Sequence, residues 1–193
     1  MKIERLIVGG VALLIGLLLG WMVRGVATYN VHAASIAGYD DWRVACPPAQ
    51  PGAADPKDIN CELSTDVVDK TQANGSVLAR VSITSEKDGK KTIGFVLPFG
   101  VALEAGMGLR IGKDPVKVYQ YRTCNTMGCI VTTPFDDALA TALKNTDDAA
   151  VMVAGLDGKA VSVPMSFKGY KTSMAAWQAG DARRKSWFWR LWS

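Results

Sequence analysis

An uncharged apolar segment near the N-terminus is the strongest constraint on this chain. Eighteen residues, LIVGGVALLIGLLLGWMV, lie between Arg5 and Arg24 without a charge. A run of ~18 or more apolar residues is long enough to cross a bilayer as a helix. The sequence therefore predicts that this segment enters a membrane and that the folded domain is formed by the residues after it.

Two outcomes are open for this segment. The small residues of VHAA, at 31–34, resemble a signal-peptidase site, at which export would remove the segment. Against cleavage, the run exceeds the ~7–15 residues of a signal core, and Trp21 and Arg24 near its outer end are typical of an interfacial anchor. We expect a retained transmembrane anchor over residues 1–24, in contact with inner-membrane lipid, and a linker over residues 25–38.

The formal charge of +4 is concentrated at the two ends of the chain. The first 33 residues carry +2 and the residues from Arg183 onward carry +4, which leaves −2 for residues 34–182. A nucleic-acid binder needs a basic face on its folded domain, so this distribution argues against nucleic acid as a partner. Basic ends on a near-neutral body suit a membrane surface instead.

Short alternating stretches separated by turn signals begin at Tyr39. Residues 76–84, SVLARVSIT, place Val77, Ala79, Val81 and Ile83 at every second position, as in a half-buried strand. Three turn signals punctuate such stretches and predict hairpins closed by primed turns: Asn74 with Gly75, Asp88 with Gly89, and Asp157 with Gly158. We expect a mainly β domain over residues 39–180, an antiparallel β-sandwich or barrel-like fold with one or two short helices.

The first expected helix lies within TPFDDALATALKN, residues 133–145. Thr133 is a candidate N-cap, Pro134 suits the first helical position, and Asp136 and Asp137 suit the first turn. Its apolar residues share one face: Phe135, Ala138, Leu139, Ala142 and Leu143. A second helix is expected from Lys171 to Ala179, ended by Gly180.

Four cysteines, Cys46, Cys61, Cys124 and Cys129, follow the apolar segment. An even number of cysteines after an export segment indicates disulfides, because disulfides persist in an oxidising compartment such as the periplasm. Structural zinc and thioredoxin-like redox centres both prefer C-x-x-C spacing, which neither neighbouring pair has. Three pairings are possible, and the turn in CNTMGC favours the local one, Cys46 with Cys61 and Cys124 with Cys129.

Several of these features occur together with longer motifs. Trp42 and Cys46 are followed by Cys61, and then by LPFGVALEAGMGLRIG at 97–112, YRTCNTMGCIV at 121–131 and VPMSFKGYKTSMAAW at 163–177. This pattern resembles the invasion-associated locus B family of bacterial periplasmic proteins, over roughly Tyr39 to Gly180. The resemblance implies a β-rich, disulfide-bonded envelope domain and brings no established reaction or catalytic residues. The long apolar segment and the basic aromatic tail depart from the simplest members of that family.

Motifs for catalysis or cofactor binding are weak. The single histidine, His32, lies in the linker, so a Ser-His-Asp or Cys-His site is not expected. The acidic doublets at 40–41, 136–137 and 147–148 are adjacent residues whose side chains diverge. GMGLRIGKD, at 106–114, misses the phosphate-loop spacing and alternates like a strand. We predict no catalytic residue, cofactor, metal site or small-molecule substrate, and no enzymatic activity.

The C-terminal tail, residues 181–193, combines basic and aromatic residues. Trp187, Phe188, Leu191 and Trp192 share a helical face after three cations. Tryptophan and basic residues together are typical of a helix at the lipid headgroup boundary. We expect a membrane-interface or partner-docking tail, with a tail folded back on its own sheet as the alternative.

These inferences together predict a single-pass protein of the bacterial inner membrane with its C-terminal domain in the periplasm. The leading functional hypothesis is a non-catalytic accessory subunit of an integral membrane protein complex, for example a respiratory one. A second hypothesis is a secreted or envelope host-interaction factor of the invasion or virulence type. A third is a thiol-disulfide redox protein that uses Cys124 and Cys129.

Overall fold

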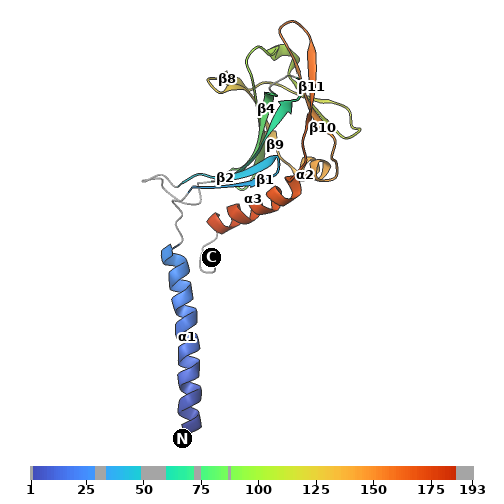
Figure 1. Ribbon diagram of the computed structural model, residues 1–193. Helices are drawn as coiled ribbons and strands as arrows, with labels where there is room; N and C mark the ends of the chain where they lie inside the picture. The colour runs from blue at the N-terminus through green and yellow to red at the C-terminus, as the bar shows by residue number, and fades with distance from the viewer. Residues whose placement is uncertain (1, 29–33, 49–59, 72–74, 87, 186–193) are drawn as a thin grey trace.

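The computed structural model describes residues 2–28, 34–48, 60–71, 75–86 and 88–185. A long helix, α1, precedes a domain of two β-sheets and two further helices (Figure 1). The elements in chain order are α1 (Lys2–Thr28), β1 (Ser35–Tyr39), β2 (Trp42–Cys46), β3 (Glu62–Asp69), β4 (Ser76–Ser85), β5 (Lys91–Leu97), the 3-10 helix η2 (Leu103–Ala105), β6 (Met107–Ile111), β7 (Lys117–Tyr119), β8 (Thr123–Asn125), β9 (Gly128–Pro134), α2 (Asp137–Lys144), β10 (Ala149–Ala154), β11 (Ala160–Met165) and α3 (Tyr170–Lys185).

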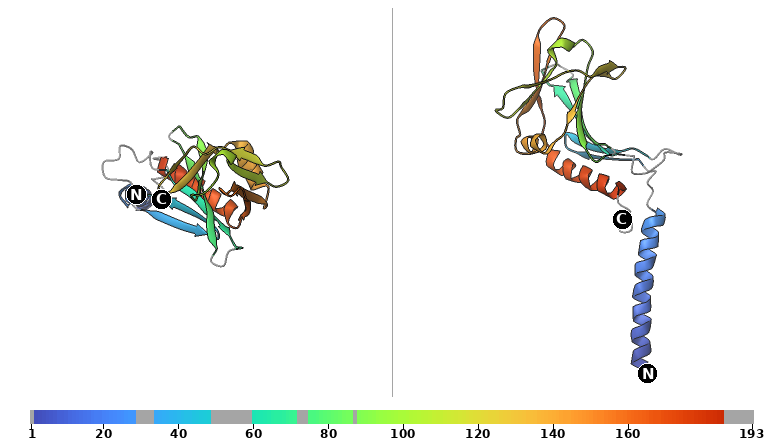
Figure 2. Two further views of the ribbon diagram at one scale, coloured as in Figure 1. Left: turned by 90° about the horizontal axis from the view of Figure 1, so that it is seen from above. Right: turned by 180° about the vertical axis from the view of Figure 1, so that it is seen from behind.

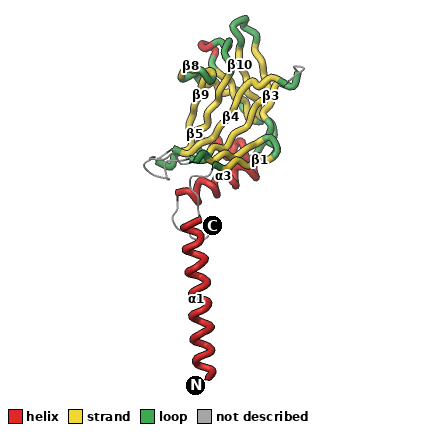
Figure 3. Tube along the Cα trace, turned by 60° about the vertical axis from the view of Figure 1, so that its left-hand side comes forward, coloured by secondary structure: helices red, strands yellow, loops and turns green. Residues whose placement is uncertain are grey.

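Both sheets are antiparallel. The larger has seven strands in the order β1-β2-β3-β4-β5-β9-β8, and the smaller has four in the order β11-β10-β6-β7. Figure 3 shows the strands of the larger sheet side by side above α1. The expected mainly β, antiparallel fold with short helices is confirmed.

One hydrophobic core joins the two sheets and α3. Its largest fully buried side chains include Trp42, Leu63, Phe95, Met107 and Trp177. Burial of this apolar surface is the main favourable contribution to the stability of the domain.

The alternating pattern in β4 is confirmed except at its first apolar residue. Ala79, Val81 and Ile83 are buried, whereas Val77 is about half exposed. The pairing of β3 with β4 shifts register between Val67 and Val68, so that Leu78 is an extra residue. A β-bulge changes the alternation between the two faces of a strand. Val77, on the other side of the extra residue from Ala79, therefore faces outward.

The hairpins at Asp88 and Asp157 form as predicted, but their turns are not primed. Gly89 and Gly158 have positive φ, of 83° and 77°, whereas the aspartates before them do not. In the second hairpin Gly155 N–H donates to Lys159 O and Gly158 N–H donates to Gly155 O. This hairpin loop is longer than the two-residue primed turn, because a turn is followed by a glycine in the left-handed conformation. Asn74, in the third predicted turn, lies outside the described residues.

Helix α2 begins later than predicted. Thr133 and Pro134 end strand β9, and Asp136 is the N-cap, its carboxylate accepting from the Leu139 N–H at 2.8 Å. Pro134 fits the strand because proline is tolerated at a strand end, and the aspartate side chain caps the first turn instead. Leu143 faces the core as predicted.

Helix α3 continues through Gly180 to Lys185, so the predicted end at Gly180 is wrong. A Cβ built on Gly180 lies 3.7 Å from Cys61 Sγ and 3.8 Å from Cys46 Sγ, an ordinary contact distance. Tertiary contacts on both sides of this glycine, at Trp177 and Asp181, hold the helix together past it. Packing of this kind overrides the weak helix propensity of a single glycine.

The disulfides form in the predicted local pairing, Cys46 with Cys61 and Cys124 with Cys129. The second pair joins the adjacent strands β8 and β9 next to Gly128. Gly128 has φ of 139°, and a Cβ on it would lie 2.3 Å from the carbonyl oxygen of Leu97. Only glycine fits this close approach between strands, which explains why the residue before Cys129 is a glycine.

Helix α1 projects away from the β-domain (Figures 1 and 2). Its side chains are described from Ile7 to Val23, and most of the apolar ones, together with Trp21, are exposed. Among the described residues, no helix has both the length and the apolar character that crossing a membrane requires. The expected transmembrane anchor over residues 1–24 is therefore not supported.

The other predicted interface residues are not placed. The side chain of Arg24, and Trp187, Phe188, Leu191 and Trp192 in the tail, lie outside the described residues. His32 lies outside them as well.

Candidate binding cleft

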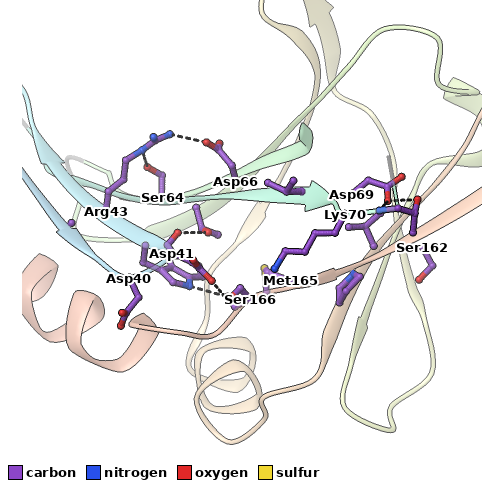
Figure 4. Close-up of a pocket in the computed structure, with 17 residues that line it drawn as sticks. Asp40, Asp41, Arg43, Ser64, Asp66, Asp69, Lys70, Ser162, Met165 and Ser166 are labelled. Atoms are coloured by element: carbon purple, nitrogen blue, oxygen red, sulfur yellow. Dashed lines mark hydrogen bonds and ion pairs between the residues drawn. The ribbon is translucent and has the colours of Figure 1, made fainter. Parts of the chain in front are cut away.

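A cleft of about 640 Å³ lies where the β1–β2 turn, strand β3 and strand β11 meet (Figure 4). Its polar lining comes from three stretches far apart in the sequence: Asp40, Asp41 and Arg43; Ser64, Thr65, Asp66, Asp69, Lys70 and Thr71; and Ser162 and Ser166. The fold, and not a local motif, brings these side chains together.

Ser166 closes one end of the cleft by joining the two sheets. Its carbonyl oxygen accepts from the Trp42 indole N–H at 2.9 Å, and its hydroxyl donates to Asp41 Oδ2 at 2.5 Å. The backbone carbonyl of Asp41 accepts in turn from the Thr65 hydroxyl at 2.7 Å. Since Ser166 follows β11 and the others lie on or beside β2 and β3, these bonds fix β11 against the larger sheet.

Asp66 is held between two arginines on the wall of the cleft. Arg80 Nε donates to Asp66 Oδ1 at 2.8 Å, and Arg43 Nη2 lies 3.5 Å from Asp66 Oδ2. This hydrogen bond to the Asp66 carboxylate raises the pKa of the Arg80 guanidinium. Arg43 also donates from Nε to the Ser64 hydroxyl at 3.2 Å. The charge of Asp66 is therefore largely offset by its neighbours.

Asp69 and Lys70 form the opposite wall, at the end of β3. Asp69 Oδ1 accepts from the backbone N–H of Thr71 at 2.9 Å and from its hydroxyl at 2.6 Å. Lys70 is exposed and extends across the cleft toward Met165 and Ser166 (Figure 4). This lysine is the one lining cation apart from Arg43 in the described part of the cleft.

The electrostatic balance of the cleft is acidic. Four aspartates line it against Arg43 and Lys70, and Arg80 pairs with Asp66 from outside the lining, so the local formal charge is −1. Asp40 is exposed, and the turn holds it at φ of 52°, a left-handed conformation that aspartate tolerates better than most residues. An acidic recess of this kind favours a cationic ligand.

The residues in the cleft do not make a catalytic constellation. No histidine or cysteine is among the described residues that line it, and the Ser166–Asp41 pair has no imidazole among them to take the proton of a serine nucleophile. Within the described ranges no three acidic, histidine or cysteine side chains are grouped as a metal site. What the lining offers is hydrogen bonds and charges to a bound molecule.

The structure separates the three acidic doublets. Asp40 and Asp41 form the β1–β2 turn, Asp136 caps α2, and Asp148 pairs with Arg110 through contacts of 2.8 and 2.9 Å. The Arg110 contact lowers the pKa of Asp148. Sequence reasoning noted the first doublet but not its role, because its partners Thr65 and Ser166 are distant in the chain.

A domain of two antiparallel sheets with two local disulfides defines a class of small, disulfide-bonded β-proteins. The sequence pattern of the family described as "Invasion associated locus B (IalB) protein" matches residues 42–178. The chain belongs to this family.

Known relatives and a solved structure agree with that membership. Two proteins named "Invasion protein B homolog", from Brucella abortus strain 2308 and from Brucella abortus biovar 1 strain 9-941, are each 24% identical over 170 residues. Each alignment covers 83% of this chain and 94% of the relative. The crystal structure of invasion associated protein B from Bartonella henselae matches with a TM-score of 0.62 at 19% identity, over 77% of this chain and 98% of that one. This likeness shows a shared fold.

Proposed function

We propose that this chain is an exported bacterial envelope protein that binds another polypeptide in the acidic cleft and catalyses no reaction. The observation that carries the proposal is the cleft itself, with four aspartates and no nucleophile–base pair. The two disulfides support an oxidising compartment such as the periplasm.

An extended, basic segment of a partner protein fits the cleft best. Strand β11 is the edge of its sheet, but Pro164 lacks the N–H that a pairing strand would need there. The partner is therefore held through side chains, with its lysines or arginines near Asp40 and Asp41. Exposed Ser162 and Lys70 supply hydrogen bonds along its backbone.

Site-specific photo-crosslinking while the producing bacterium is in contact with cultured host cells tests this proposal. A photoreactive residue at Ser162, inside the cleft, should give a crosslink to one discrete protein. The same residue at Lys113, an exposed position outside the cleft, should not. Equal crosslinking from both positions, or none from Ser162, would contradict the proposal.

The partner we favour is a host-cell protein. This follows the host-interaction hypothesis, which is supported by relatives whose names refer to invasion. A strain without the gene should then enter cultured host cells less efficiently, and the intact gene should restore entry. Unchanged entry of the deletion strain would exclude this role.

A second candidate is an accessory subunit of an inner-membrane complex, retained by α1 as a single-pass anchor. The exposed apolar side chains along α1, which have no place in the β-core, favour it. Intact mass of the protein purified from membranes in mild detergent separates the candidates. A full-length mass with stoichiometric companions supports the subunit, whereas a mass beginning near Ala34 supports a released factor.

A further inference from the structure

A second recess, of about 360 Å³, lies between helices α2 and α3 and the start of β5. Three lysines line it, each from a different element: Lys91 at the start of β5, Lys144 in the last turn of α2, and Lys171 in the first turn of α3. Asp137 is the one acidic residue in the lining. The recess is thus basic, opposite in sign to the cleft described above.

The three ammonium groups have no carboxylate partner in the described part of the chain. The ion pairs there involve other lysines, Lys90 and Lys159, and several arginines. Lys91 instead lies over the ring of Trp177, 5.7 Å from its centroid, which holds its ammonium group in place. Three like charges around one recess repel one another unless an anion lies between them.

Much of the rest of the lining is apolar, apart from Thr141 and Gln178. Phe135 and Tyr170 are buried at the floor, beside Met174 and Ala140. Tyr170 is fixed between the rings of Trp42, at 4.9 Å, and Phe167, at 5.6 Å. A ligand that satisfies both parts of this lining carries an anionic group and an adjoining apolar portion.

Helix α3 borders the recess and carries further basic residues. Helix α3 runs from α2 toward α1, so that its C-terminal end is the end nearer to α1, as Figures 1 and 2 show from opposite sides. The last three residues of α3 are all basic in sequence: Arg183, Arg184 and Lys185.

We propose that the α2–α3 recess binds the phosphate of an anionic phospholipid through Lys91, Lys144 and Lys171. The apolar acyl portion of the lipid packs against Met174 and Ala140. Free inorganic phosphate shares the anionic chemistry but leaves this apolar wall uncovered, so the lipid is the better ligand.

Native mass spectrometry of the full-length protein in a non-ionic detergent tests the proposal. Phosphatidylglycerol or phosphatidylcholine is added at equal concentration, and the fraction of protein that retains one lipid is measured. The variant Lys144→Gln/Lys171→Gln removes two of the three cations. Its matched control, Lys113→Gln/Lys159→Gln, makes the same change in net charge at exposed sites outside the recess.

The wild type and the control variant should retain phosphatidylglycerol in preference to phosphatidylcholine. The recess variant should bind it roughly 10- to 30-fold more weakly, with an unchanged melting temperature. Equal retention of the two lipids by the wild type, or equal affinity of the two variants, would overturn the proposal. A parallel NMR titration with inorganic phosphate distinguishes the source, since lysine-dependent phosphate binding without lipid retention would make free phosphate the ligand.

Discussion

The indole N–H of Trp177 donates to the backbone carbonyl of Cys61 at 2.8 Å, across 116 residues of sequence. Trp177 is fully buried on the inner face of α3, and Cys61 belongs to the disulfide that closes the first loop of the domain. This contact joins the last helix to the residue that precedes β3 of the larger sheet.

Removing this tryptophan should destabilise the domain strongly. Trp177→Ala should lower the free energy of unfolding by about 3–5 kcal/mol, because it leaves a cavity. Trp177→Phe should cost about 1–3 kcal/mol, because the buried Cys61 carbonyl loses its donor. Denaturant unfolding measures both, with Trp21→Phe on exposed α1 as the control that should change nothing. Equal stability of Trp177→Phe and the control would refute the structural role.

Two glycines near α3 should respond oppositely to alanine. A Cβ on Gly169 would lie 1.9 Å from the backbone oxygen of Tyr39, at a φ of 78°, so Gly169→Ala should prevent normal folding or greatly destabilise it. Gly180 has room for a Cβ and lies within the helix. Gly180→Ala should therefore raise stability by about 0.5–1 kcal/mol, through helix propensity. Thermal unfolding of the two variants checks the order, and a stable Gly169→Ala protein would show that Tyr39 lies elsewhere.

The two disulfides should differ in their contribution. Cys46 and Cys61 are 15 residues apart, and Cys124 and Cys129 are 5 apart. Chain entropy then predicts losses of about 3 kcal/mol for Cys46→Ala/Cys61→Ala and about 2 kcal/mol for Cys124→Ala/Cys129→Ala. Chemical denaturation of the two double variants tests this order. Loss of a thiol-exchange activity in the second variant, with little loss of stability, would favour the redox hypothesis instead.

Alkaline pH should destabilise the fold through Tyr170. Burial raises the pKa of its phenol to about 12, so the folded state keeps a proton that the unfolded state loses above about pH 10. The contribution of this group is complete below pH 10 and declines as pH rises toward 12, by about 2–3 kcal/mol. Unfolding measured from pH 9 to pH 12 should show this decline in wild type and a smaller one in Tyr170→Phe. Parallel curves for the two proteins would contradict the assignment.

Local patterns predicted much of the fold because they depend on near neighbours. The alternation at Ala79, Val81 and Ile83 identified β4, and the spacing of Cys124 and Cys129 identified a stapled hairpin. The errors arose where tertiary contacts overrode local preference. The bulge at Leu78 exposed Val77, and packing on the first disulfide carried α3 past Gly180.

The cleft and the lysine recess had no local signature. Ser166 and Asp41 are 125 residues apart in the chain, and Lys91, Lys144 and Lys171 come from three separate elements. Ordinary charged and hydroxyl residues at such separations carry no spacing that indicates a site. Tertiary packing brings each set together: Ser166 after β11 bonds to Asp41 beside β2, and the three lysines come from β5, α2 and α3.

The most direct test of the proposed binding function compares how tightly a partner segment binds to the wild type and to Asp40→Asn. The segment used is the one that crosslinking from Ser162 identifies. Asparagine also tolerates the left-handed turn, so this variant removes a charge from the cleft and preserves the fold. The account predicts binding weaker by roughly two- to fivefold, with a smaller dependence on salt, and no change for Asp114→Asn outside the cleft. Equal affinity of wild type and Asp40→Asn at low and high salt would contradict an acidic cleft that binds a basic partner.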